Sequence, residues 1–204
     1  LHACSEIEAV GGYVGNFQIT IRKKATYVNW KDCTGCGLCV EKCPSRKLPD
    51  AFNENLCKAP SINIPFPQAI PKKAAINAAS CLMLQKGKCG LCAKVCPVKC
   101  IDFEQKDELV NVDVGAIVVA TGYDIFDWHK YPQYGEGRYP DVITSMQYER
   151  MLSASGPTGG HVKRPSDGKE PRNVVFIQCV GSRDKSVDRP YCSGFCCMYT
   201  AKQA

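Results

Sequence analysis

The stretch at residues 33–44 reads CTGCGLCVEKCP. Its cysteines follow the spacing C-x2-C-x2-C-x3-C with a proline directly after the last, and this spacing lets one tight loop wrap three thiolates around a [4Fe-4S] cubane. A structural zinc site uses four ligands in paired C-x2-C hooks, a pattern that leaves the third cysteine and the proline unexplained. The stretch therefore favours an iron–sulfur cluster over zinc. Its four thiols are Cys33, Cys36, Cys39 and Cys43.

A second run, CGLCAKVCP at residues 89–97, keeps the last three cysteines of the pattern but has Lys86 at the first position. The nearest free cysteine upstream is Cys81, and the residues between it and Cys89 could loop out. In two-cluster ferredoxins the cysteine before the proline ligates the other cluster. The predicted ligand sets are Cys33, Cys36, Cys39 and Cys96 for one cluster, and Cys81, Cys89, Cys92 and Cys43 for its neighbour.

Three further cysteines lie outside these sets. Cys100 follows Cys96 at C-P-x2-C spacing and could replace Cys81, although it falls where the chain should be leaving the cluster. Cys57 lies in a polar insertion and Cys4 is isolated in the sequence, so both are interpreted as bystanders.

The chain has 204 residues, 15 of them cysteine. A disulfide framework is typical of short secreted chains, whereas this chain is longer, has an odd number of cysteines and starts with neither Met nor a signal-peptide pattern. No apolar run reaches the roughly 18 residues that a membrane span needs. We therefore expect a cytoplasmic protein, truncated at both ends, without a membrane span.

The whole net charge of +6 lies in residues 1–105, which hold 14 basic and 8 acidic residues. A basic surface suggests nucleic acid, but two oxidised cubanes with their thiolates add about −2 each to this half. Charge compensation is the better interpretation, and we expect no nucleic-acid partner.

The pattern outside the cysteine runs predicts an α/β protein. Residues 7–28 alternate as in a β-hairpin, and residues 145–153 have the character of a helix. Apolar runs at residues 112–120 and 173–177 are typical of buried parallel strands. The predicted organisation is an α+β two-cluster ferredoxin domain at 31–105, inserted into a larger domain formed by 1–30 and 106–204.

The turn Ala120, Thr121 and Gly122 after the first apolar run is a weak sign of flavin binding, because many α/β folds end a strand this way. No G-x-G-x-x-G occurs in the chain, so the main phosphate loop of any dinucleotide domain must lie elsewhere.

Four thiols gather near the end of the chain at C-x12-C-x3-C-C spacing. Buried free cysteines or a vicinal redox pair would explain them as well as a metal site would. Adjacent cysteines on one cubane need distorted backbone, so any cluster here should be atypical. The four are Cys179, Cys192, Cys196 and Cys197.

In combination these segments resemble the iron–sulfur flavoprotein subunit of heterodisulfide reductase, its A subunit, found in methanogens, sulfate reducers and related anaerobes. Besides both cysteine runs, the resemblance is carried by GYVGNF at 12–17, IRKK at 21–24, IPFPQA at 64–69, VATGY at 119–123, ERMLS at 149–153, RPSDG at 164–168, QCVGSR at 178–183 and CCMY at 196–199.

The resemblance implies a thioredoxin-reductase-like FAD domain interrupted by the ferredoxin insert. It also implies that Cys179, Cys192, Cys196 and Cys197 bind an atypical third [4Fe-4S] cluster. At matching positions of the family, a lysine approaches the flavin N5 and a glutamate lies near the isoalloxazine, which here are Lys202 and Glu149; a surface lysine and a helix-face carboxylate are the plainer alternatives.

The resemblance further implies an oxidoreductase component that uses FAD to divide electron pairs. A hydrogenase or formate dehydrogenase partner would supply the pairs; one electron would go toward the disulfide-reducing subunits and the other to ferredoxin. The 204 residues alone are expected to be inactive. The alternatives are a subunit of a quinone-interacting oxidoreductase of sulfate reducers and an electron relay without chemistry of its own.

Overall fold

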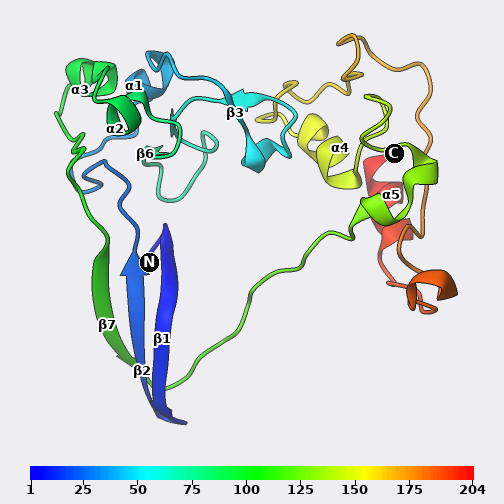
Figure 1. Ribbon diagram of the computed structural model, residues 1–204. Coiled ribbons are helices and arrows are strands. Elements are labelled where there is room, and N and C mark those ends of the chain that lie inside the picture. The colour runs from blue at the N-terminus through cyan, green and yellow to red at the C-terminus, as the bar shows by residue number, and fades with distance from the viewer. The chain divides into compact units, whose positions relative to one another are not determined.

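The structure is a computed structural model that describes all of residues 1–204 (Figure 1). The chain forms two compact units, each described by itself. Unit 1 comprises residues 1–49 and 58–120, and unit 2 comprises residues 50–57 and 121–204. No helix in the chain is both long and apolar enough to cross a membrane.

Unit 1 begins with the predicted hairpin. Strands β1 (Ser5–Tyr13) and β2 (Asn16–Lys23) pair antiparallel, and β7 (Glu108–Val114) adds to the other side of β2. The register pairs Ile19 with Val112 and Ile21 with Val110, so one face of the sheet is apolar because side chains alternate along each strand. The sheet brings the segments before and after the cysteine-rich region together (Figure 1).

The cysteine-rich region is made of short elements. They are helices α1 (Leu38–Glu41), α2 (Leu82–Lys86) and α3 (Leu91–Val95) and the two-residue strand pairs β3 (Leu48–Pro49) with β4 (Lys58–Ala59) and β5 (Ile62–Asn63) with β6 (Ala75–Ile76). The buried core is small and includes three of the cysteines. Its members are Val28, Cys33, Ile62, Ala74, Ile76, Cys81 and Cys100. A core this small, with thiols inside it, fits a fold that metal binding stabilises.

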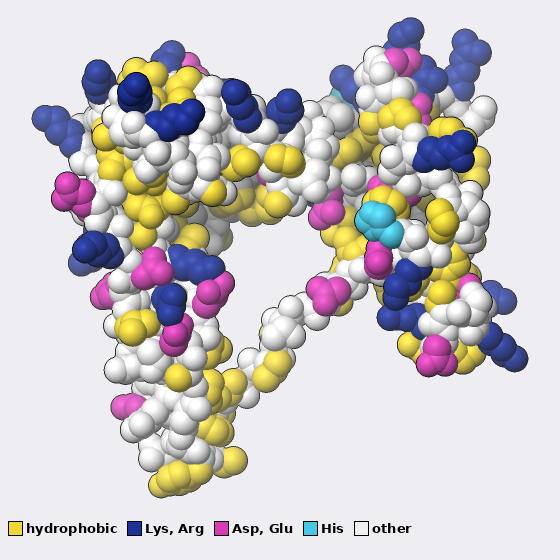
Figure 2. Space-filling view, viewed as in Figure 1, with side chains coloured by type: hydrophobic (Ala, Val, Ile, Leu, Met, Phe, Trp, Pro, Cys, Tyr) yellow, Lys and Arg dark blue, Asp and Glu magenta, His cyan; other side chains and the backbone are white.

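Basic side chains are spaced over the surface of the α1–α3 region rather than gathered in one patch (Figure 2). Apolar side chains lie between them on the same face.

Unit 2 contains helices α4 (Ser145–Leu152) and α5 (Cys196–Gln203). Helix α4 confirms the helix predicted at residues 145–153. It begins at Thr144 because the Thr144 hydroxyl accepts from the Gln147 N–H while the Gln147 side chain accepts from the Thr144 N–H, a complete capping box. Single 3-10 turns make up its other regular structure, at Ala51–Asn53, Trp128–Lys130, Pro132–Tyr134 and Lys185–Val187.

Residues 50–57 lie against α4. Arg150 donates two hydrogen bonds to the side-chain oxygen of Asn53, at 3.1 and 2.9 Å, and its guanidinium lies 4.7 Å from the centre of the Phe52 ring. Gln147 donates to the carbonyl of Glu54 at 3.2 Å. These contacts anchor one face of α4, the helix that carries Glu149.

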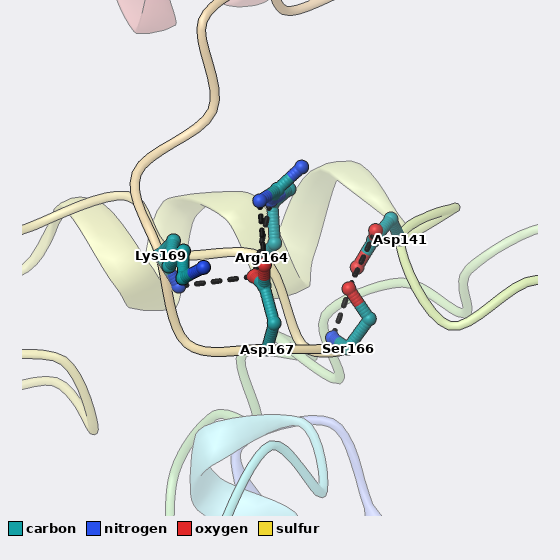
Figure 3. Close-up of polar contacts among 5 residues, drawn as sticks. All are labelled: Asp141, Arg164, Ser166, Asp167 and Lys169. Atoms are coloured by element: carbon teal, nitrogen blue, oxygen red, sulfur yellow. Dashed lines mark hydrogen bonds and ion pairs between the residues drawn. The ribbon is translucent and has the colours of Figure 1, made fainter.

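The RPSDG segment of unit 2 forms a closed loop (Figure 3). Asp167 accepts from the Arg164 side chain and from the backbone N–H of Lys169, each at 3.1 Å to one carboxylate oxygen. Ser166 donates its hydroxyl to Asp141 at 2.8 Å and its backbone N–H at 3.0 Å. The polar side chains of this segment are therefore used to hold the loop itself.

Two strand predictions are wrong. Only residues 112–114 of the first apolar run are in a strand, and that strand is antiparallel to β2; residues 173–177 form none. Neither run is buried, since Val118 is 89% and Val175 84% exposed. Extended backbone becomes a strand only where another strand accepts and donates its hydrogen bonds. Beyond one bond from the Gly15 N–H to the Gly115 carbonyl, no strand pairs with residues 115–120 or 173–177. The observed fold is small and mixed α/β.

Candidate iron–sulfur sites and a paired lysine and glutamate

The first thiol pocket lies between the loop before α1 and the end of α3. The loop approaches its surroundings closely: at Gly35, with φ +66°, an added Cβ would collide with the carbonyl oxygen of Lys72. Gly37, with φ 84°, begins α1 in the left-handed conformation that glycine adopts freely. The cysteines that line this pocket are Cys33, Cys36, Cys39, Cys96 and Cys100.

The second thiol pocket is lined by four cysteines, which are Cys43, Cys81, Cys89 and Cys92. Cys81 is buried and stands directly before α2, and its carbonyl accepts from the Gln85 N–H at 2.9 Å. The residues between Cys81 and Cys89 form α2 and then turn at Gly87, whose φ is 64°. The insertion therefore loops out as a helical turn and leaves Cys81 in the pocket.

Among the eight predicted ligands, each pocket takes three thiols from one part of the cysteine pattern and one from the other; Cys100 is an additional thiol in the first pocket. Cys43 lies in the second pocket and Cys96 in the first, as the two predicted ligand sets require. The thiols surround a space rather than a point: no three His, Cys, Asp or Glu side chains converge closely enough for a single metal ion. A cubane has its own sulfides and irons between the thiolates, so the residues present fit such a group.

The pockets are dry, and this raises the pKa of their thiols. Apolar side chains make up most of the remaining lining, among them Val28 and Ile64 in the first pocket and Ile62 in the second. Burial raises the pKa of Cys39 and that of Cys92 to about 11 each, because desolvation disfavours the thiolate. Metal binding at these positions must therefore displace a proton.

Cys100 lines the first pocket and not the second, so its placement does not support it as a substitute for Cys81. Its sulfur lies 3.5 Å from the Cys96 sulfur, and its backbone N–H donates to the same sulfur at 3.4 Å. Burial opposes ionisation of Cys96, but the hydrogen bonds from Cys100, together with those from the backbone of Val98 and Lys99, outweigh it and lower the pKa of Cys96. Burial and the bond to Cys96 raise the pKa of Cys100 to about 12.

The other two unassigned cysteines line neither pocket. Cys57 belongs to the segment held against α4, where its thiol lies 3.7 Å from a carboxylate oxygen of Asp50, and burial and that carboxylate raise its pKa. Cys4 is exposed.

The structure brings the last four cysteines together around the first turn of α5. The pKa of Cys197 is raised by the adjacent Cys196 and, to smaller extents, by the charges of Cys179 and Cys192, which requires all four to be near one another. Cys179 has φ 61°, a left-handed conformation that is strained for a residue with a side chain. Cys192 accepts the Gly194 N–H at 3.4 Å. The adjacent Cys196 and Cys197, where distorted backbone was expected, instead begin the regular helix α5, and the left-handed residue is Cys179.

Helices α4 and α5 bring Glu149 and Lys202 into contact. The Lys202 ammonium donates to one carboxylate oxygen of Glu149 at 2.6 Å, and the Gln203 amide donates to the other at 3.1 Å. Both donors stabilise the ionised carboxylate, so they lower the pKa of Glu149, with Lys202 the larger cause. Lys202 remains 67% exposed, so its charge is available to a ligand on this face.

Replacing Lys202 with Met is expected to raise the pKa of Glu149 toward that of an ordinary glutamate, because the larger of its two stabilising donors is lost. The ionised Glu149 carboxylate stabilises the folded state fully above its unfolded-state pKa, and this stabilisation is lost as the pH falls through its lower folded-state pKa. In the variant the two pKa values should lie closer together, so the stabilisation and the pH range over which it is lost should both be smaller. Carboxyl-carbon NMR titration measures the shift. Gln203→Ala is the matched control and should raise the pKa by less; an unchanged pKa in Lys202→Met would contradict the pairing.

The remaining predicted contact, Ala120, Thr121 and Gly122, lies in irregular, exposed chain. Gly122 has φ +76° with no atom near the position of a Cβ. These residues are not gathered with Glu149 and Lys202 by any hydrogen bond in the structure.

Comparisons with known proteins match one family model and several relatives. A family described as "4Fe-4S binding domain" matches residues 26–46. The A subunit of "H(2):CoB-CoM heterodisulfide,ferredoxin reductase" from Methanothermobacter marburgensis is 46% identical over 98% of this chain and 29% of its own length. One of the A-type iron–sulfur subunits of CoB–CoM heterodisulfide reductase from Methanopyrus kandleri is 49% identical over 100% of this chain and 30% of its own length.

A further relative, from Archaeoglobus profundus and named as similar to the A subunit of heterodisulfide reductase, is 41% identical over 98% of this chain and 34% of its own length. The chain thus spans about a third or less of the length of these relatives. Identity at this level over the whole chain is decisive for membership. The chain belongs to the family of heterodisulfide reductase A subunits.

Proposed function

We propose that this chain is the part of an oxidoreductase complex that holds two [4Fe-4S] clusters side by side and passes electrons between partners. The observation that carries the proposal is the division of eight cysteines into two four-thiol sets around two separate pockets, with Cys43 and Cys96 exchanged between the runs. When bound, each cluster accepts and releases one electron.

The chain's own residues give these clusters a fixed and dry setting. Gly35 allows a close approach of the backbone at the first pocket, Gly37 supplies a left-handed turn there, and Val28 is 1% exposed beside it. Ile62, at 2% exposed, is the corresponding buried apolar side chain at the second pocket. Burial and hydrogen bonds to sulfur set the reduction potential of such clusters, so these side chains would determine how readily each one accepts an electron.

We also propose that unit 2 contributes a third, atypical [4Fe-4S] cluster and part of an FAD site in a thioredoxin-reductase-like domain. Support for the cluster comes from four neighbouring thiols and the strained Cys179. Support for the flavin contact comes from Lys202, an exposed cation whose position is fixed by Glu149. The 204 residues contain no glycine-rich nucleotide loop, so they would supply the flavin-facing pair and not the whole cradle.

Lys202 has a direct electrostatic role in this proposal. FAD, when bound, exchanges electron pairs with one partner and single electrons with another. The ammonium of Lys202 would stabilise negative charge at the reduced ring and could donate a proton there, and the Glu149 carboxylate, 2.6 Å away, would orient it.

The proposed reaction is the division of electron pairs between CoB–CoM heterodisulfide and ferredoxin, in the cytoplasm, within a complex with other heterodisulfide reductase subunits and a hydrogenase or formate dehydrogenase that supplies electrons. The names of relatives support these partners: one from Methanococcus maripaludis is the A subunit of "H(2)/formate:CoB-CoM heterodisulfide,ferredoxin reductase".

The test is a coupled assay on the anaerobically purified complex. Ferredoxin reduction by H2 or formate should depend on added CoB–CoM heterodisulfide, and the preparation should contain flavin. Ferredoxin reduction at the same rate with and without the heterodisulfide, in a preparation that contains iron and sulfide but no flavin, would instead support a simple electron relay. Reduction of a quinone, with neither ferredoxin nor heterodisulfide reduced, would support the alternative of a quinone-interacting oxidoreductase subunit.

A further inference from the structure

The first thiol pocket contains one cysteine more than a cubane can use. A [4Fe-4S] cluster takes four thiolates, one for each iron, and the second pocket has four. The first pocket has a fifth, Cys100, which is 5% exposed and follows Cys96 by one turn of chain.

The fifth thiol interacts most strongly with the thiol of Cys96 and more weakly with that of Cys33. The sulfurs of Cys96 and Cys100 lie 3.5 Å apart, within hydrogen-bond range for sulfur, and the Cys100 backbone N–H points to the same Cys96 sulfur at 3.4 Å. Cys100 therefore contacts the Cys96 sulfur through both its backbone N–H, which donates, and its thiol, which can donate once Cys96 is a thiolate ligand. Of Cys96 and Cys100, we take Cys96 as the cluster ligand. It is the last cysteine of the second run and lies in the first pocket, just as Cys43, the last cysteine of the first run, lies in the second pocket.

We propose that Cys100 is a positioning residue that donates an S–H···S hydrogen bond to the cluster-ligating sulfur of Cys96. This inference rests on the proposed cluster in the first pocket. Reduction adds one negative charge that spreads over the cluster and its thiolates, and a donor to a ligand sulfur stabilises that charge. The bond raises the reduction potential of the first cluster.

The second pocket has no corresponding thiol, because its four cysteines are all used as ligands. The two clusters of the module therefore differ by a donor that belongs to this chain. Cys100 biases the electron toward the cluster of Cys33, Cys36, Cys39 and Cys96.

The experiment compares two substitutions at Cys100 in the full protein, purified anaerobically. Cys100→Val fills the site without a donor, and Cys100→Ser keeps a donor. EPR-monitored redox titration gives the potential of each cluster, and iron and sulfide analysis gives their number. Cys57→Ala is the control, because that thiol lines neither pocket.

The expected result is an unchanged iron content in every variant, a lower potential for the first cluster in Cys100→Val, and a potential in Cys100→Ser closer to that of the unmodified protein. The second cluster should keep its potential throughout. Equal potentials in Val and Ser variants would overturn the hydrogen bond, and a loss of about four irons in both would make Cys100 a ligand instead. An unmodified protein without iron would overturn the cluster proposal itself.

A measurement on the unmodified protein covers the case in which Cys100→Val does not fold. Proton ENDOR of the reduced first cluster, in H2O and after long exchange into D2O, should reveal an exchangeable proton coupled to it that is absent from Cys100→Ala. A spectrum identical in the unmodified protein and Cys100→Ala would contradict the proposal.

Discussion

Replacing Cys81 with Ala is expected to remove about four irons and four sulfides per chain, because one cubane loses a ligand that no nearby thiol can replace. Cys81 is 8% exposed, belongs to the small core and lines the second pocket. Cys100, the one spare pocket thiol, lies in the other pocket. The loss should also make unit 1 more sensitive to proteolysis, since cluster binding and folding are coupled in a domain with so small a core.

The matched control for Cys81 is Cys57→Ala, which removes a part-buried thiol outside both pockets and should leave iron and sulfide unchanged. Iron analysis together with EPR of the reduced protein distinguishes the outcomes, because the loss of one cluster also removes its magnetic interaction with the neighbour. Full iron content in Cys81→Ala would show that another residue completes the second set.

The double substitution Cys196→Ser and Cys197→Ser is expected to remove about four further irons while both clusters of the ferredoxin module remain. Adjacent thiols at the first turn of α5 would supply two of the four ligands, and the other two would come from Cys179 and Cys192, whose charges reach Cys197. Serine is close in size to cysteine, so the helix itself should keep its packing.

Lys202→Met provides the control for this double variant. It changes another residue of α5, removes the ion pair with Glu149, and should leave the iron content intact. A double variant that retained all its iron would mean that the four cysteines are free thiols or a redox pair, and the third cluster would have to be abandoned.

The sequence predicts best those parts of the chain whose structure depends on local information. The three-thiol loop at residues 33–39 is specified by spacing and by glycines that permit close wrapping, and neither depends on distant chain. The helix at 145–152 is equally local, since Thr144 and Gln147 complete a capping box within four residues. The hairpin of β1 and β2 follows from strand alternation and a short turn.

The prediction fails where structure depends on partners far away in the chain. Residues 115–120 and 173–177 are apolar enough for buried strands, but a parallel strand exists only between neighbours, and these runs have none within the 204 residues. Their composition suits the interior of a sheet, but their backbone N–H and C=O groups have no neighbouring strand to pair with.

Cys100 shows a different limit. Its C-P-x2-C spacing indicates that it is close to Cys96, but spacing alone does not say which pocket it faces, and only the turn after α3 places it in the first. The contact between Glu149 and Lys202 joins residues 53 positions apart, which no sequence period reports; the resemblance to a family named each residue, and the packing of α4 and α5 pairs them.

The central claim is that the chain holds three [4Fe-4S] clusters. Its most direct test is native mass spectrometry of the anaerobically reconstituted chain, which measures the mass of bound iron and sulfide per molecule. The account predicts an added mass of about twelve irons and twelve sulfides, falling by about four of each in Cys81→Ala and in the Cys196→Ser, Cys197→Ser variant. A chain that carried zinc without sulfide, or whose Cys81→Ala variant kept its full added mass, would contradict it.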